Sequence, residues 1–293
     1  MAAAAIGGAL LAALALVAGS AGAAPETVRF PSAQSGTTLV GYLYRPAGDG
    51  PFPAAVLLHG RAGPYSSNVS GACTLVDGVS PSPCGAQSLS RRHQAWGEFW
   101  ARRGVLALLV DSFGPRGLGH GFARGTHGSA QRVPVHEATV RPLDAEGALA
   151  WLRARADVRA ERIALQGWSN GASTVINLLQ RSRSGGGAGF VAALALYPGC
   201  GAAAVPVRSL RASAPATVFL GGADEEVSPA ACRAFLERAD PSGAPVEVVW
   251  YDDATHDFDD PGPARQAVAA NRRARDDVER RAEAFAREVL GAR

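Results

Sequence analysis

Short apolar runs alternate with longer segments of mixed polarity along most of the chain. The runs are typical of strands, most of them buried, and they lie at residues 54–58, 105–110, 163–165, 191–197, 217–220 and 246–251. The segments between and after them are typical of helices, at residues 91–103, 143–156, 172–179, 229–239 and 264–290, the last long and charged. Strands that alternate with helices predict an α/β fold with a mostly parallel central sheet and helices on both faces.

Weaker patterns fill the rest of the chain. Residues 27–30 and 38–44 predict short strands joined by a polar turn. Residues 61–90 and 114–140 are irregular, and we expect these two stretches to set the substrate preference. No repeat or linker stands out, which predicts a single domain over residues 25–293.

The first 24 residues differ from the remainder because they carry no charge and are almost wholly aliphatic or glycine. They end in Ala21-Gly22-Ala23-Ala24, a small-residue pattern like a signal-peptidase site. We therefore expect residues 1–24 to be a signal peptide, the mature protein to be secreted or periplasmic, and no stable membrane span to remain after cleavage. The alternative is an uncleaved anchor, since about 20 apolar residues can span a bilayer.

Composition narrows the functional classes. Hydrophobic residues make up 47% and charged residues 19% of the 293 positions, which is typical of a well-buried globular core. All basic residues are arginine, and they are scattered among 26 acids for a net charge of only +3. This balance does not favour nucleic-acid binding. No feature of the sequence indicates an oligomeric state.

Four cysteines fit an exported protein with disulfide bonds: Cys73, Cys84, Cys200 and Cys232. The first two flank a loop rich in Gly, Ser and Pro, where a bridge would contribute about 3 kcal/mol in the chain-entropy model. Four cysteines allow three connectivities, and the sequence alone does not choose among them.

A nucleophile motif follows the apolar run at residues 163–165. Gly167-Trp168-Ser169-Asn170-Gly171 matches G-x-S-x-G, in which the serine sits on a sharp turn between a strand and a helix. Strand and helix approach so closely there that a Cβ at either glycine would clash. Ser169 is therefore the predicted nucleophile.

Serine needs a histidine to accept its proton and an acid to hold that histidine. In hydrolases with this elbow, the chain order is serine, acid, histidine. His256 is the only histidine after Ser169, and Asp224 is the first acid after the run at 217–220. The adjacent and nearby acids are kept as alternatives to Asp224: Glu225, Glu226, Asp252, Asp253 and Asp257.

Two backbone N–H groups are expected to bind the oxyanion. One belongs to Asn170, directly after the nucleophile. The other is assigned to Arg61, because Gly60 lets the loop after residues 54–58 turn inward. His59 is expected to hydrogen-bond within that loop and to take no part in catalysis.

Several further pieces together resemble the dienelactone hydrolase family of α/β-hydrolases. They span most of residues 38–290 and comprise His59-Gly60, Val110-Asp111-Ser112-Phe113, Arg116-Gly117, Arg141, Asp144-Ala145, Ala148-Leu149-Ala150-Trp151-Leu152, Gly167–Gly171, Tyr197-Pro198-Gly199, Asp224, Val227, Pro229 and Ala254-Thr255-His256. The resemblance implies an α/β-hydrolase fold whose sheet order makes the regions of Cys200 and Cys232 neighbours. A bridge between them would then fasten the acid loop, the segment after residues 217–220 that carries Asp224. Dienelactone hydrolases proper use a cysteine nucleophile, so Ser169 favours a serine esterase that acts on a small-molecule or polymeric ester without a cofactor.

Substrate-binding candidates follow from position and from the resemblance. Tyr65 and Trp168 are candidates for apolar walls, with core packing as the alternative for the tryptophan. Arg61 and Arg116 are candidates for binding a substrate carboxylate, as arginines do in the family, with surface placement as the alternative. No metal site is expected from His120, His127 and His136, because they are spaced too widely for one helical face and come without cysteines or a carboxylate pattern.

Two other functions remain open from the sequence. A serine peptidase of the oligopeptidase-related type shares the elbow and the order of the triad. A non-catalytic binding protein on a hydrolase scaffold is the other alternative, against which stands the presence of all three residue types in the required order.

Overall fold

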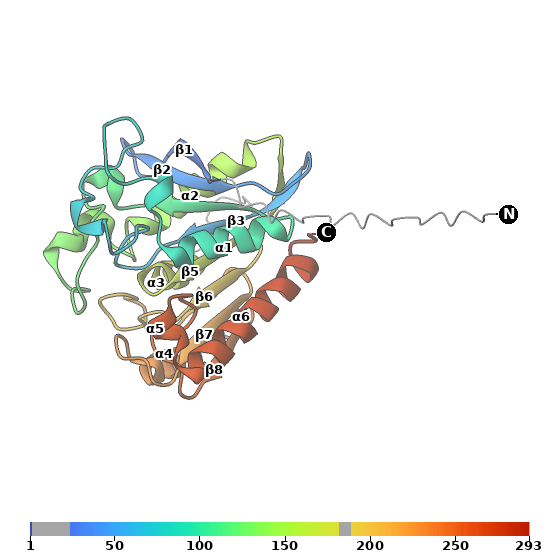
Figure 1. The fold of residues 1–293 in the computed structure, drawn as a ribbon. Helices are drawn as coiled ribbons and strands as arrows, with labels where there is room; N and C mark the ends of the chain where they lie inside the picture. The colour runs from blue at the N-terminus through green and yellow to red at the C-terminus, as the bar shows by residue number, and fades with distance from the viewer. Residues whose placement is uncertain (2–23, 182–188, 293) are drawn as a thin grey trace.

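The computed structural model describes residues 1, 24–181 and 189–292 (Figure 1). Eight strands form one sheet in the order β1-β2-β4-β3-β5-β6-β7-β8. Their bounds are β1 Glu26–Pro31, β2 Thr38–Tyr44, β3 Phe52–Leu58, β4 Leu106–Asp111, β5 Val158–Trp168, β6 Ala193–Leu196, β7 Ala216–Gly221 and β8 Val246–Tyr251. Strand β2 runs antiparallel to β1 and β4, and all other neighbours are parallel.

Helices cover both faces of this sheet (Figure 1). Their bounds are α1 Arg91–Arg102, α2 Arg141–Arg153, α3 Asn170–Gln180, α4 Pro229–Leu236, α5 Pro263–Gln266 and α6 Ala269–Glu288. Side chains of α2, α3 and α4 form one core with the sheet, and side chains of α1 and α6 form a second core on the opposite face. In β3, for example, Val56 and Leu58 belong to the first core while Leu57 belongs to the second. The predicted mostly parallel sheet with helices on both faces is confirmed.

Most predicted elements agree with the structure to within two or three residues at their ends, and two differ by more. Strand β5 begins at Val158, earlier than the buried run at 163–165. The single helix expected over residues 264–290 is divided into α5 and α6, because Val268 adopts an extended backbone with ψ 116°. This break lets the Asn271 side chain bond Thr255 and the Arg265 carbonyl, and so ties α6 to the loop that carries His256.

The two irregular stretches contain only short 3-10 turns, at Ser70–Ala72, Ala86–Ser88, Gly114–Arg116 and Ala130–Val135. The structure pairs Cys73 with Cys84 inside the first stretch and Cys200 with Cys232 beside α4. The predicted leader lies outside the described residues, apart from residues 1 and 24. Within the described part of the chain, no helix combines the length and the apolar character that crossing a membrane requires.

Candidate active site

The turn between β5 and α3 holds Ser169 in a strained backbone conformation. Its φ is 51° and its ψ is −115°, a region that side-chain-bearing residues rarely occupy. A Cβ on Gly167 would lie 2.4 Å from the Gly171 carbonyl oxygen, and one on Gly171 would lie 2.0 Å from the Leu58 oxygen at the end of β3. The two glycines are therefore required because strand, turn and helix pack backbone against backbone.

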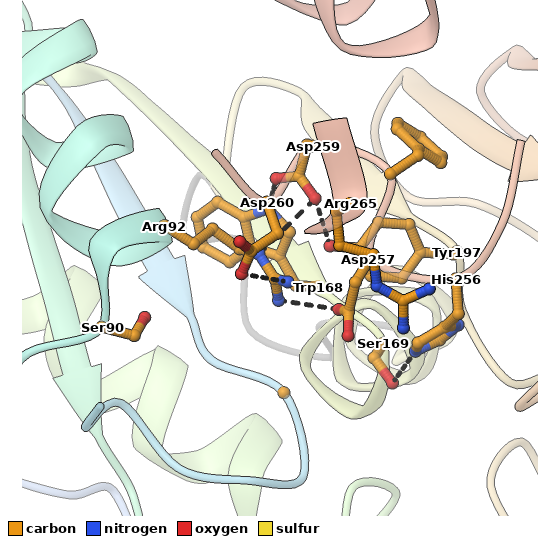
Figure 2. Close-up of polar contacts among 12 residues, drawn as sticks. Ser90, Arg92, Trp168, Ser169, Tyr197, His256, Asp257, Asp259, Asp260 and Arg265 are labelled. Atoms are coloured by element: carbon orange, nitrogen blue, oxygen red, sulfur yellow. Dashed lines mark hydrogen bonds and ion pairs between the residues drawn. The ribbon is translucent and has the colours of Figure 1, made fainter. Parts of the chain in front are cut away.

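A continuous chain of hydrogen bonds runs from this serine to an acid. The Ser169 hydroxyl lies 3.0 Å from Nε2 of His256, and Nδ1 of the same ring lies 2.7 Å from Oδ2 of Asp224 (Figure 2 shows the serine–histidine contact). The geometry suits an imidazole that donates from Nδ1 to the carboxylate and accepts the serine proton at Nε2. The other oxygen of Asp224 accepts the backbone N–H groups of Glu226 and Val227, which orients the carboxylate.

The alternative acids have other partners. Asp252 and Asp253 are exposed beyond β8. Glu225 accepts the backbone N–H of His256 at 2.9 Å and does not contact its ring. Glu226 lies 3.7 Å from Nε2, and Asp257 pairs with Arg92 at 2.8 Å. Of the acids named from the sequence, Asp224 has the geometry that a histidine-orienting residue needs.

The protonation of His256 is set by opposing effects. Burial lowers its pKa, but the hydrogen bond to Asp224 and the charges of Asp257, Asp224 and Glu226 outweigh it, so the pKa is raised above its usual value. A raised pKa makes the ring a stronger base and stabilises the imidazolium that forms when serine gives up its proton.

A partly buried ion-pair network holds the histidine loop, residues 252–262. Arg92 of α1 pairs with Asp257 at 2.8 Å, with Asp260 at 3.1 Å and with Asp259 at 3.6 Å (Figure 2). Asp257 adopts a φ of 59°, which turns the chain just after His256. The loop is thus fastened to α1.

Asp259 is the centre of this network. It is fully buried, and its Oδ2 accepts the indole N–H groups of Trp96 and Trp168, each at 2.8 Å. The Tyr197 hydroxyl donates to its Oδ1. Burial raises the pKa of Asp259, while Arg92 and these donors favour the charged form. One carboxylate therefore links the histidine loop, α1 and the nucleophile elbow.

The loop after β3 lies against the elbow, as the oxyanion assignment requires. A Cβ on Gly60 would sit 3.6 Å from the Cβ of Ser169. Helix α3 begins at Asn170, and the first N–H groups of a helix have no partner within it. Buried Arg141 bonds both the His59 carbonyl, at 2.8 Å, and the Asn170 side chain, so it ties together the two segments that carry the candidate donors.

His59 itself is structural. Its Nδ1 contacts the Gly60 carbonyl at 2.7 Å, and its Nε2 accepts the Ser112 backbone N–H at 3.3 Å. Burial lowers its pKa well below the usual value, which keeps the ring neutral.

A cavity of about 260 Å³ opens above Ser169 and His256. Its wall combines serine hydroxyls with charged side chains. Besides Ser169, His256 and Tyr65, the polar and charged lining residues are Arg61, Ser67, Ser70, Ser90, Arg92, His93, Glu226, Asp257 and Asp260. Tyr65 also lines it, but its hydroxyl is bonded to Tyr42 and Asp111, so it offers the cavity only part of its ring.

Two substrate-binding candidates are wrong. Trp168 is fully buried, packs on Trp96 and is not part of the cavity wall, because its indole is needed as a donor to Asp259. Arg116 also lies away from the cavity, where it makes two bonds to buried Asp144 and one to Gln34. Arg61 does line the cavity, but its guanidinium is held by Glu226.

The histidines of residues 114–140 do not form a metal site with one another: His127 contacts Glu137 at 2.9 Å, and His136 bonds the Ala138 backbone. Among the described residues, one group has ligand atoms close enough to share a cation, all within 4.8 Å: Glu226, His256 and Asp257. Arg61 and Arg92 already neutralise its two carboxylates, and their positive charges oppose a bound cation.

Sequence reasoning missed the residues that position the site, namely Arg92, Asp259 and the pairing of Glu226 with Arg61. The one signal for them was the cluster of acids after His256, in which Asp259 and Asp260 follow Asp257 within three positions. Such acids usually lie in solvent, and no spacing rule shows which of them is buried.

Comparisons with known proteins agree with this architecture. Residues 116–289 match the model of the dienelactone hydrolase family. A putative dienelactone hydrolase from Klebsiella pneumoniae has a similar structure, with 18% identity and a TM-score of 0.64 over 90% of this chain and 98% of that one. Propionate-bound esterase 2 from Thermogutta terrifontis is similar too, with 18% identity and a TM-score of 0.62 over 92% of this chain and 96% of that one.

The same esterase phosphorylated by paraoxon gives 20% identity and a TM-score of 0.61, over 92% of this chain and 96% of that one. No curated protein matches the sequence. At these identities the structural likeness shows the fold, and the predicted α/β-hydrolase fold is confirmed. Because the family model covers more than half of the chain, this protein belongs to the dienelactone hydrolase family.

Proposed function

We propose that the protein is a serine hydrolase that cleaves carboxylic esters through an acyl-enzyme. One observation carries the proposal: the 3.0 Å contact of Ser169 with His256 and the 2.7 Å contact of His256 with Asp224, directly beneath a cavity. The site contains each group that acyl transfer needs.

In the proposed reaction, the Ser169 hydroxyl attacks the acyl carbon and passes its proton to Nε2 of His256. Asp224 holds the ring in the required tautomer and stabilises the imidazolium. The N–H groups of Arg61 and Asn170 bind the oxyanion, each contributing about 3 kcal/mol to transition-state stabilisation. As the tetrahedral intermediate collapses, His256 returns the proton to the leaving alcohol and the acyl-serine ester remains.

Deacylation repeats these steps with water. His256 accepts a proton from the water as its oxygen attacks the acyl-enzyme, and then gives that proton to Ser169 as the carboxylic acid leaves. The side chains of this chain supply every proton transfer, so the mechanism needs no cofactor. The Thermogutta terrifontis protein is an esterase that paraoxon phosphorylates, which supports the same chemistry for a related fold.

We also propose that the mature protein is a single domain over residues 25–293 that works outside the cytoplasm. Two disulfides, Cys73–Cys84 and Cys200–Cys232, support an oxidising compartment, and the leader supports export. Intact-mass analysis of the exported protein should give a chain without residues 1–24; a full-length mass would instead support the anchor.

A fluorophosphonate probe tests the catalytic proposal. We expect stoichiometric labelling at Ser169, loss of labelling in Ser169→Ala, and hydrolysis of p-nitrophenyl butyrate in preference to peptide anilides. An unlabelled wild-type protein would exclude both the esterase and the peptidase, and faster cleavage of the anilides would favour the peptidase.

A further inference from the structure

Glu226 occupies a place in the pocket that the proposed reaction does not use. It follows β7 and lies two residues after Asp224, whose Oδ1 fixes its backbone N–H at 2.8 Å. Its side chain is only 6% exposed and lines the cavity over Ser169. A carboxylate held so far out of water must have compensating partners.

Those partners are two arginines from different segments. Arg61 makes a two-bond contact, with Nε 2.9 Å from Oε2 and Nη2 2.7 Å from Oε1. Arg124, from the second irregular stretch, adds a contact of 2.6 Å to Oε1. Arg61 is also bonded to Phe122 through both its side chain and its backbone carbonyl. Glu226 thus connects three segments: the acid loop, the loop after β3 that carries Arg61, and the irregular stretch at residues 114–140.

The arrangement fixes the peptide that carries a proposed oxyanion donor. Two parallel N–H···O bonds define the orientation of a guanidinium, unlike a single contact. Since the Arg61 side chain is anchored at Glu226, its backbone N–H is restrained as well. Small errors in the position of such donors reduce catalysis strongly.

The same carboxylate lies beside the reacting atoms. Its Oε2 is 3.7 Å from Nε2 of His256, the atom that contacts Ser169. This distance is too long for a hydrogen bond, so the effect on the ring is electrostatic. The charge also faces any substrate group in the cavity, where Arg61 and Arg92 are already paired with acids.

We propose that Glu226, given the esterase function above, is a positioning and specificity residue that anchors Arg61 beside the oxyanion and makes the pocket favour neutral over anionic esters. The preference follows from this pairing: Glu226 occupies Arg61 and the acids of the histidine loop occupy Arg92, so a substrate carboxylate would find both pocket arginines already paired. Other charged or titratable groups act on His256 at the same time. They are Asp224 and Glu225 from the acid loop, Asp257 from its own loop, Tyr197 after β6, and Arg92, Arg124 and Arg265 through their acidic partners.

Glu226→Gln, which keeps the shape and removes the charge, is the test. Two substrates with four-carbon acyl groups are compared, neutral p-nitrophenyl butyrate and anionic p-nitrophenyl hemisuccinate. We expect kcat for the butyrate to fall about tenfold and the hemisuccinate-to-butyrate ratio of kcat/KM to rise about tenfold. Because a negative charge near His256 is lost, the acid limb of kcat/KM should move down by about one pH unit.

Arg124→Gln is an independent test at an exposed residue, which can still be measured if Glu226→Gln fails to fold. Loss of this positive charge should move the acid limb up, in the opposite direction, and lower the hemisuccinate-to-butyrate ratio. Glu237→Gln, a surface change directly after α4, is the matched control and should alter neither quantity.

The outcomes separate the two proposals. Absence of wild-type labelling at Ser169 would reject the esterase function itself. Normal labelling with unchanged pH limbs and an unchanged substrate ratio in both variants would overturn the role of Glu226. Shifts of both variants in the same direction would also overturn it, since the two side chains carry opposite charges.

Discussion

Ser169 and His256 meet at 3.0 Å, but the chain positions them by different means. The nucleophile elbow is held by its backbone, because Gly167 and Gly171 bring strand, turn and helix into direct contact. The histidine loop is held by side chains, through Arg92 and the bonds to Asp259.

The two regions should therefore fail in different ways. Adding one carbon to the elbow forces backbone atoms apart, which changes the fold whatever the polarity of the new group. In the histidine loop, side-chain size matters less than side-chain charge, because a buried carboxylate is stabilised only by its hydrogen-bond donors and its cation. We therefore expect the elbow to be sensitive to side-chain size and the histidine loop to be sensitive to side-chain charge.

The largest expected effect is on rate, at the acid that orients the histidine. In Asp224→Asn, the side-chain oxygen can still accept the N–H groups of Glu226 and Val227, so the loop should keep its shape. The amide N–H then faces Nδ1 of His256 and favours the wrong tautomer. We expect kcat to fall about 10⁴-fold with little change in the thermal midpoint. A rate near that of the wild type would move the orienting role to another acid.

Much of the elbow could be predicted from the sequence for the same reason that it is rigid. Gly167 and Gly171 are visible in the sequence and are needed because a Cβ at either position would clash with backbone atoms. The apolar run before them places the turn at the end of a strand. The chain order of serine, acid and histidine selects His256, the only histidine after Ser169, but it leaves several acids open beside Asp224. The parallel sheet was also predictable, because strands buried on both faces have continuous apolar sequences.

The histidine loop was not predictable, because its stability depends on which charges become buried together. Arg92 and Asp259 are 167 positions apart and have no spacing that relates them. Trp168 was wrongly considered for the substrate wall because only the fold shows that its indole donates to Asp259. The division between α5 and α6 was missed because it depends on bonds of Asn271 to a distant loop.

A change of size in the elbow should have the next largest effect. In Gly171→Ala, the new Cβ would lie 2.0 Å from the Leu58 oxygen and 2.7 Å from the His59 oxygen, both backbone atoms that a side-chain rotation cannot move. We expect a loss of about 3 kcal/mol in the free energy of unfolding, measured by urea denaturation. Gly201→Ala is the control, because nothing lies within 4 Å of its added Cβ. Equal stability of the two variants would refute the steric account of the elbow.

A change of charge in the histidine loop should have a smaller but distinct effect. Asp259→Asn keeps the size of a fully buried side chain and can keep its acceptor toward the indoles of Trp96 and Trp168. Its amide N–H would then point at Tyr197, whose hydroxyl can turn to accept. What the variant loses is the one fully buried negative charge among the three acids around Arg92. We therefore expect a loss of about 2 kcal/mol in unfolding free energy and a decrease in kcat/KM of about tenfold.

Asp260→Asn separates this effect from a general sensitivity of the loop. Asp260 pairs with the same arginine at 3.1 Å, but its side chain is 32% exposed, so water compensates for the lost ion pair. We expect a change of at most about 1 kcal/mol and nearly normal kinetics. If Asp259→Asn were as mild as Asp260→Asn, the loop would be held by packing like the elbow, and the contrast between the two regions would disappear.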